Sequence, residues 1–155
     1  MMAAVRTRGA LALASLDQVD TQPLPSLRRE ATTRHHILIV EDDSRVAGMI
    51  QTSLELEGEP DWAVEKACGG KHALELASAT SPDLVLLDVW LPDLDGAEVY
   101  HQLRSNPKTR DTRVLFLSAG TSLDLFQHGI EDGVLLRKPY HMPELVSLVR
   151  ALLDE

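Results

Sequence analysis

One aspartate, Asp88, directly follows a continuous apolar run at positions 84–87. A run of this length is typical of a strand that is buried on both faces of a parallel sheet. Open sheets of this class bind their ligands at the carboxyl ends of the strands, where Asp88 is expected to lie. On its own, the same position also suits a polar strand end or a helix cap. The other polar residues that follow apolar runs decide between these interpretations.

Three further apolar runs, at 37–40, 114–117 and 134–136, also lead into polar side chains that could do chemistry. These side chains are, in chain order, Glu41, Asp42, Ser118 and Lys138. If the runs are parallel strands, their carboxyl ends share one edge of a sheet and these groups meet there. The sequence therefore predicts a cluster of carboxylates with one hydroxyl and one ammonium group.

Carboxylates gathered in this way need a counter-charge. Two of them about 4 Å apart repel by about 4 kcal/mol at an effective dielectric constant of about 20. A divalent cation removes this cost, and a site made of oxygen atoms favours Mg²⁺. Beside such a cation, Asp88 is expected to attack phosphorus and form an acyl phosphate. Ser118 and Lys138 would then contact the phosphoryl oxygens and neutralise their charge.

Helical periodicity fills the intervals between the apolar runs, so strands and helices alternate along the chain. Strands are expected at 37–40, 62–67, 84–87, 114–117 and 134–136. Helices are expected from about 44 to Gly58, after Gly70, at 96–104 and from Pro143, whereas 121–130 is ambiguous. Five such units predict an α/β fold of the flavodoxin-like class, with a doubly wound parallel sheet in the order 2-1-3-4-5 and helices on both faces.

The composition is that of one globular domain, with 155 residues of which 44% are hydrophobic and 25% charged. A formal net charge of −9 makes nucleic acid a poor partner. No apolar run approaches the roughly 20 residues of a membrane span, so no membrane contact is expected. The single cysteine, Cys68, rules out an internal disulfide, suits the cytoplasm and is expected to be packed. Met49 is likewise expected on the buried face of its helix, beside Ile50.

Residues 1–34 differ from the rest of the chain, because they carry several arginines and prolines without sustained apolar periodicity. This pattern predicts a disordered N-terminal extension, with the folded domain at 35–155. Two alternatives remain open for the extension. One is a secretory signal, although its apolar core is short. The other is a short helix at 10–16, which would need a partner to bury its apolar face.

Four segments together resemble the receiver domain of two-component response regulators, over about residues 35–155. They are ILIVEDD at 37–43, LVLLDVWLPDLDG at 84–96, Ser118-Ala119 and Lys138-Pro139. The resemblance implies that Asp88 is the phosphorylated aspartate and that Ser118 and Lys138 contact its phosphoryl group. It also implies a cis peptide bond between Lys138 and Pro139.

The same resemblance implies a Mg²⁺ site. Glu41 and Asp42 match the acidic pair of the family, and Asp42 is expected to be the more direct ligand. Asp88 would supply a further carboxylate oxygen, and Trp90 would supply its backbone carbonyl. Asp43, one position beyond the pair, is expected to be an N-terminal charge of the following helix.

The chain departs from the family pattern at three positions. Leu135 stands where receivers commonly carry an aromatic switch residue, which puts the usual coupling to the outer face in doubt. Trp90 and Gly120 stand where side chains are thought to tune hydrolysis of the acyl phosphate. Neither can orient a water molecule through a side-chain amide or carboxylate, and Trp90 is expected to shield the acyl phosphate instead.

The expected function is that of a stand-alone receiver rather than an enzyme. A sensor histidine kinase or a histidine phosphotransfer protein would phosphorylate Asp88, and output would run through contact with a downstream protein target. A DNA-binding output is not expected, because no second domain follows. One alternative is a Mg²⁺-dependent phosphatase of the haloacid dehalogenase type, but Trp90 stands where that class needs a second acid. The other is a degenerate receiver that serves as a docking scaffold.

Overall fold

The computed structural model describes residues 34–131 and 133–154. The predicted N-terminal extension therefore lies outside the described residues, apart from Arg34. The described residues form the folded unit that begins at His35. None of the helices in this part of the chain is long and apolar enough to cross a membrane.

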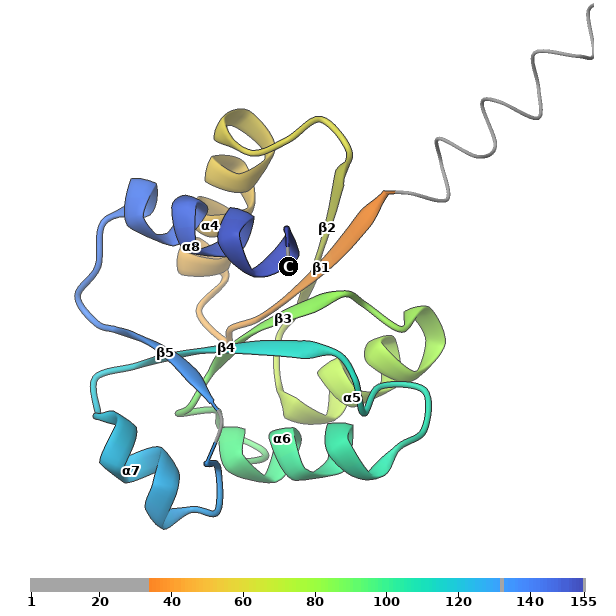
Figure 1. Cartoon of the computed structure of the whole chain (residues 1–155), viewed down its shortest axis with the longest axis vertical. Helices are drawn as coiled ribbons and strands as arrows, with labels where there is room; N and C mark the ends of the chain where they lie inside the picture. Colours follow the sequence, from red (N-terminus) through yellow and green to blue (C-terminus); the bar gives the residue numbers. More distant parts are fainter. Residues whose placement is uncertain (1–33, 132, 155) are drawn as a thin grey trace, which may run out of the picture. The chain divides into compact units, whose positions relative to one another are not determined.

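Five parallel strands form a single sheet in the order β2-β1-β3-β4-β5 (Figure 1). The strands are β1 (His35–Val40), β2 (Trp62–Ala67), β3 (Leu84–Asp88), β4 (Arg113–Ser118) and β5 (Val134–Arg137). This is the predicted strand order, and it makes β3 the central strand. All five residues of β3 are buried, as expected for a strand that helices cover on both faces.

The intervening helices alternate with the strands, as the periodicity predicts. They are α4 (Ser44–Glu57), α5 (Gly70–Thr80), α6 (Gly96–Ser105), α7 (Ser122–Gln127) and α8 (Met142–Leu153). In Figure 1, α4 and α8 cover one face of the sheet, and α5, α6 and α7 lie on the other. The ambiguous segment 121–130 thus contains a short helix, which ends before Gly129, a residue with a φ of +80°.

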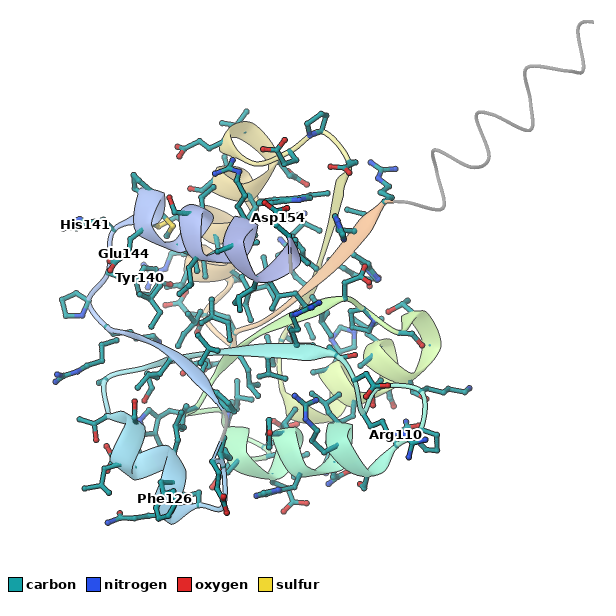
Figure 2. All side chains as sticks on the ribbon, in the orientation of Figure 1. Arg110, Phe126, Tyr140, His141, Glu144 and Asp154 are labelled. Carbon is teal, nitrogen blue, oxygen red and sulfur yellow. The ribbon has the colours of Figure 1, made fainter. Side chains whose placement is uncertain are left out.

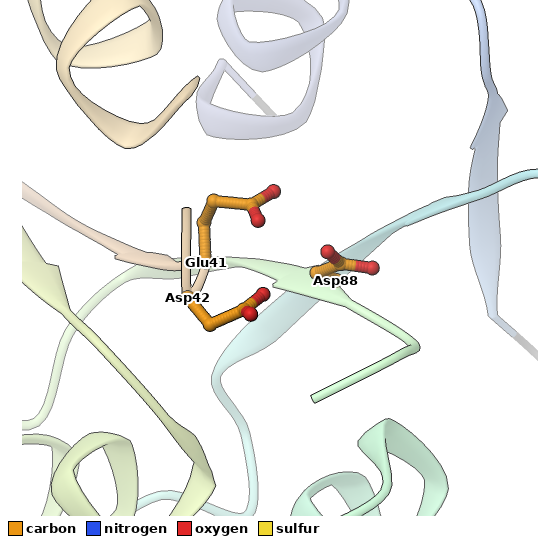
Figure 3. A group of neighbouring side chains, drawn as sticks. All are labelled: Glu41, Asp42 and Asp88. Atoms are coloured by element: carbon orange, nitrogen blue, oxygen red, sulfur yellow. The ribbon is translucent and has the colours of Figure 1, made fainter. Parts of the chain in front are cut away.

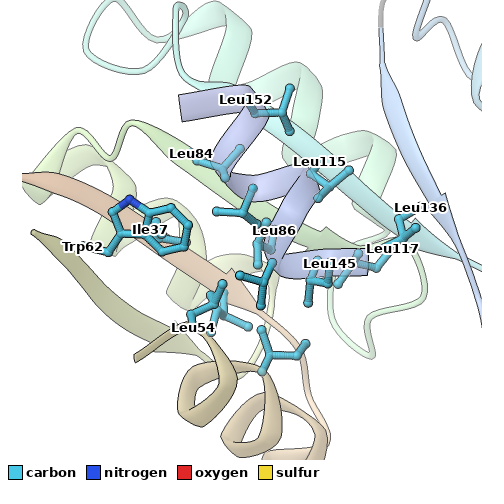
Figure 4. Packing of buried hydrophobic residues seen from close by; sticks show 14 of the residues in the cluster. Ile37, Leu54, Trp62, Leu84, Leu86, Leu115, Leu117, Leu136, Leu145 and Leu152 are labelled. Carbon is cyan, nitrogen blue, oxygen red and sulfur yellow. The ribbon is translucent and has the colours of Figure 1, made fainter. Parts of the chain in front are cut away.

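The alternation of side chains along each strand divides the core into two parts. On β3, Leu84 and Leu86 pack toward α4 and α8, whereas Val85 and Leu87 pack toward α5 and α6. Figure 4 shows the first of these clusters, in which Leu145 of α8 lies over the strand side chains. Both faces of the sheet are therefore closed, and the carboxyl edge of the strands is left for polar groups.

Two single-residue expectations are wrong. Met49 is 58% exposed, because Ala47 and Ile50 provide the buried face of α4. Cys68 is also exposed, and its Sγ atom lies 3.7 Å from Nδ1 of His72. It follows the last residue of β2, an edge strand, where the chain turns toward α5. Figure 2 shows a further exposed apolar side chain, that of Phe126 on α7.

Candidate functional site

The ends of β1 and β3 bring the acidic residues together. Val40 pairs with Leu87 in the parallel ladder, so the next residues, Glu41 and Asp88, lie side by side at the carboxyl edge of the sheet. The backbone N–H of Glu41 still donates to the carbonyl of Ala67 on β2, at 3.2 Å. This bond continues the ladder one residue beyond β1 and fixes the backbone position from which the Glu41 side chain extends.

Three carboxylates form a cluster at this edge (Figure 3). One oxygen each from Glu41, Asp42 and Asp88 lies within 4.8 Å of the other two. Glu41 and Asp88 are both only 4% exposed, whereas Asp42 faces solvent. Asp43, the next residue, does not join the cluster; its side chain accepts from the Arg45 N–H and caps α4, as predicted.

Lys138 reaches this cluster from β5. Its backbone N–H donates to the carbonyl of Ser118 at 2.8 Å, which continues the β4–β5 pairing past the last strand residue. Its Nζ lies 3.3 Å from Oδ2 of Asp88 and 3.8 Å from Oε1 of Glu41. The peptide bond between Lys138 and Pro139 is cis, as expected.

The other oxygen of Asp88 contacts the chain itself. Oδ1 accepts a hydrogen bond from the backbone N–H of Trp90 at 3.1 Å. Trp90 itself is 75% exposed. Asp88 is thus held at both oxygens, by a backbone N–H on one and an ammonium group on the other. A carboxylate fixed in this way is oriented before any partner arrives.

The carboxyl group of Glu41 has a raised pKa. Burial raises the pKa of its carboxyl to about 7, and the negative charge of Asp88 acts in the same direction. Oε2 accepts a hydrogen bond from the backbone N–H of Asp43 at 3.2 Å. Oε1 is buried and has no hydrogen-bond partner among the described residues. A buried oxygen of this kind, beside two other carboxylates, fits a divalent cation that favours oxygen ligands.

Ser118 ends β4 beside this cluster. It is buried, and its Oγ accepts a hydrogen bond from the backbone N–H of Gly120 at 3.0 Å. The neighbouring cavity has a volume of about 240 Å³. Its lining includes Trp90, Ser118, Gly120, Asp124, Leu125 and His128. The hydroxyl group therefore stands between the carboxylate cluster and a cavity that α7 borders.

Some residues near the site were missed from the sequence. Asp93 accepts from the backbone N–H groups of Gly70 and Lys71, at 2.8 and 3.0 Å, and so caps α5 from a distant loop. These bonds lower the pKa of Asp93 to about 2. The sequence held only an indirect sign of this cap. The N-cap residue of α5 is Gly69, which has no side chain, so the capping group has to come from another segment. Burial raises the pKa of Tyr140 to about 12, and the charges of Glu41 and Asp88 add to the effect.

Comparison with known proteins agrees with this geometry. Residues 37–150 match the family model of the response regulator receiver domain. The response regulator MprA of Mycolicibacterium vanbaalenii is 40% identical over 119 residues, which are 76% of this chain and 49% of that protein. RpaA of Synechocystis, described as a DNA-binding dual master transcriptional regulator, is 38% identical over 120 residues, which are 76% of this chain and 48% of that protein. The chain thus spans about half the length of these curated relatives.

A solved structure shows the same fold. It is the receiver domain of a sensor histidine kinase from Pseudomonas aeruginosa, with a magnesium ion coordinated in its active-site cleft. The TM-score is 0.68 at 24% identity, and the match covers 79% of this chain and 99% of that one. Together with the family match over 37–150, the parallel sheet and its strand order lead to one conclusion. The chain belongs to the response regulator receiver domain family.

Proposed function

We propose that Asp88 accepts a phosphoryl group from a phosphohistidine, carried by a sensor histidine kinase or a histidine phosphotransfer protein. The observation that carries this proposal is the setting of Asp88. Its carboxylate is buried at the carboxyl end of the central strand, between two other carboxylates and the ammonium group of Lys138. Such a carboxylate is oriented for attack, and charged groups that could bind a phosphoryl group already surround it.

The transfer exchanges one bond to phosphorus for another. An oxygen of Asp88 forms a bond to the phosphorus, the bond from phosphorus to the imidazole nitrogen breaks, and the histidine leaves with that electron pair. Lys138 and Ser118 contact the phosphoryl oxygens and balance their negative charge. Lys138 already lies 3.3 Å from Asp88, so a small movement of its flexible side chain brings it to the new group.

Mg²⁺ is the cofactor of this proposal. Glu41, Asp42 and Asp88 would hold it through carboxylate oxygens, together with the backbone carbonyl of Trp90 and water. The orphaned buried Oε1 of Glu41 supports this assignment, as does the magnesium ion in the solved receiver from Pseudomonas aeruginosa. When bound, the ion supplies positive charge that draws the phosphoryl oxygens toward Asp88.

Output is proposed to run through contact with a downstream protein. The net charge of the whole chain is −9, which disfavours binding to phosphate backbones. The DNA-binding activity in the name of RpaA belongs to a protein about twice as long as the matching region. An enzymatic role as a phosphatase is disfavoured, because the residue two positions after Asp88 is Trp90, which cannot act as an acid or base.

The test is phosphate uptake from a small phosphodonor, such as acetyl phosphate, with and without Mg²⁺. We expect about one phosphate per chain in the wild type, loss of uptake without Mg²⁺, and loss in Asp88→Asn. Asp111→Asn, which removes an exposed acid at the opposite edge of the sheet, is the matched control and retains uptake. Labelling that persists in Asp88→Asn would contradict the assignment. Turnover of a generic phosphomonoester would favour the phosphatase.

A further inference from the structure

The space beside Gly120 is filled by a carboxylate from another element. A Cβ atom added at Gly120 would lie 2.7 Å from Oδ2 of Asp124 and 3.4 Å from Oγ of Ser118. The first distance is too short for any real Cβ, whereas the second is an ordinary contact. The absence of a side chain at position 120 therefore leaves room for the carboxylate of Asp124 near the Ser118 hydroxyl.

Asp124 is held in this position by the loop that precedes α7. Its Oδ2 accepts hydrogen bonds from both the backbone N–H and the Oγ1 hydroxyl of Thr121, at 2.6 and 3.0 Å. The bond from the Thr121 N–H is one half of the capping box of α7, whose other half is the Thr121 side chain accepting from the backbone N–H of Asp124. Both bonds to Oδ2 lower the pKa of the Asp124 carboxyl. The carboxyl is thus ionised at neutral pH, and the residue is exposed to solvent.

Ser118 and Asp124 line the same cavity of about 240 Å³. Under the proposed function, Ser118 contacts an oxygen of the phosphoryl group on Asp88. Val89 and Trp90, which directly follow Asp88, also line the cavity, so a water molecule in it would stand near that group and near Asp124. The cavity has room for several water molecules, since one occupies about 30 Å³ in the liquid.

We propose that Asp124 positions the water molecule that hydrolyses the acyl phosphate of Asp88. This inference rests on the proposed function. The water oxygen forms a bond to phosphorus, the bond from phosphorus to the Asp88 oxygen breaks, and the Asp88 carboxylate is restored. Both water protons leave with the inorganic phosphate, while Asp124 accepts the hydrogen bond that orients the attacking oxygen. Asp124 is therefore a positioning residue, and it supplies from α7 the acidic group that position 120 lacks.

Two substitutions test this role in independent ways. Asp124→Asn keeps a side-chain oxygen that can accept from Thr121, so the cap of α7 is preserved. Its neutral amide oxygen is a weaker acceptor for water than the carboxylate it replaces. Gly120→Ala keeps Asp124 and displaces its carboxylate, because the new Cβ would lie 2.7 Å from Oδ2. The carboxylate can turn away at little cost, since it is the end of a flexible side chain. Asp111→Asn is the control for the loss of one negative charge.

The measurement is the rate at which phosphate is lost from full-length protein, after labelling by acetyl phosphate and removal of the donor. Each single variant should take up phosphate as the wild type does and lose it about tenfold more slowly, because only the hydrogen bond that orients the attacking water is weakened. The double variant should be no slower than the slower single variant, because both act on one carboxylate. Asp111→Asn should lose phosphate at the wild-type rate.

Beryllofluoride, which mimics a bound phosphoryl group, separates positioning from simple charge repulsion. Asp124→Asn should bind it with wild-type affinity, because the orienting hydrogen bond forms only with the attacking water. Normal uptake with an unchanged rate of phosphate loss would overturn the inference and leave the proposed function standing. Tighter beryllofluoride binding that matches the slower loss would also overturn it. Failure of the wild type to take up phosphate would overturn both.

Discussion

The ammonium group of Lys138 lies 3.3 Å from Oδ2 of Asp88, although the two residues are fifty positions apart in the chain. The same Nζ is 3.8 Å from Oε1 of Glu41, which is buried and lacks a hydrogen-bond partner among the described residues. Lys138 thus offsets the repulsion between two carboxylates that are both 4% exposed. A cation bound in the cluster and the ammonium group would both offset this repulsion.

Replacing Lys138 by Gln should therefore change two properties in opposite directions. Mg²⁺ should bind several-fold more tightly, because a competing positive charge is gone. Phosphate uptake should fall by about 100-fold, the loss typical when one charged contact to a developing anion is removed. Trp90 fluorescence can report Mg²⁺ binding in a Trp62→Phe background. Lys108→Gln, at the far edge of the sheet, should change neither property. Weaker Mg²⁺ binding in Lys138→Gln would contradict this account.

Trp90 is expected to lengthen the life of the acyl phosphate. Its side chain is 75% exposed and lines the cavity beside Ser118, where it can limit the access of water. Trp90→Asn should therefore lose phosphate about tenfold faster than the wild type, which corresponds to about 1.4 kcal/mol in the barrier. The decay of labelled protein measures this rate. Trp62→Phe, on the opposite side of the sheet, should decay as the wild type does. An equal or slower decay in Trp90→Asn would count against shielding.

Asp93 should make the stability of the domain depend on pH in the acid range. Its hydrogen bonds to the N-terminus of α5 lower its pKa from 3.8 to about 2 in the folded state. A lowered pKa stabilises the fold above about pH 4, and this contribution disappears as the pH falls toward 2. Asp93→Asn should thus lower the urea midpoint clearly at pH 6 and progressively less as the pH falls through 3 toward 2. If the two proteins differed in urea midpoint by the same amount at every pH, the charge of Asp93 would not contribute to stability.

The sequence predicted the architecture because the signals for it are local. Five apolar runs mark the strands, and four of these runs lead into a polar residue. The rule that parallel strands share a carboxyl edge is then enough to predict that these polar residues meet. The convergence of Asp88, Ser118 and Lys138 follows from that rule together with the strand order 2-1-3-4-5.

What could not be predicted depends on contacts between distant segments. Nothing near Asp93 shows that it caps α5, and nothing near Gly120 shows that Asp124 fills the space beside it. The exposure of Met49 and Cys68 was missed for a related reason. For Met49, apolar residue type alone does not tell which of two adjacent helix positions faces the sheet. For Cys68, it does not tell that the chain leaves the sheet directly after β2.

Without an aromatic residue at position 135, phosphorylation must be transmitted by another route. In this structure, Oγ of Ser118 accepts from the N–H of Gly120, in the loop that leads into α7. If the hydroxyl turns to the phosphoryl group, it gives up this bond, and the loop and α7 are released from one of their anchors. Beryllofluoride with Mg²⁺ should therefore speed backbone hydrogen exchange over 119–128.

Two variants decide which residue carries this signal. Ser118→Ala should remove most of the change in exchange, because the hydroxyl that links the loop to the phosphoryl group is gone. Leu135→Ala should retain it, since the half-buried Leu135 only packs against the apolar cluster on the α5, α6 and α7 face. If Leu135→Ala abolished the response and Ser118→Ala kept it, transmission through the Ser118–Gly120 hydrogen bond would be wrong. The signal would then pass through side-chain packing on β5.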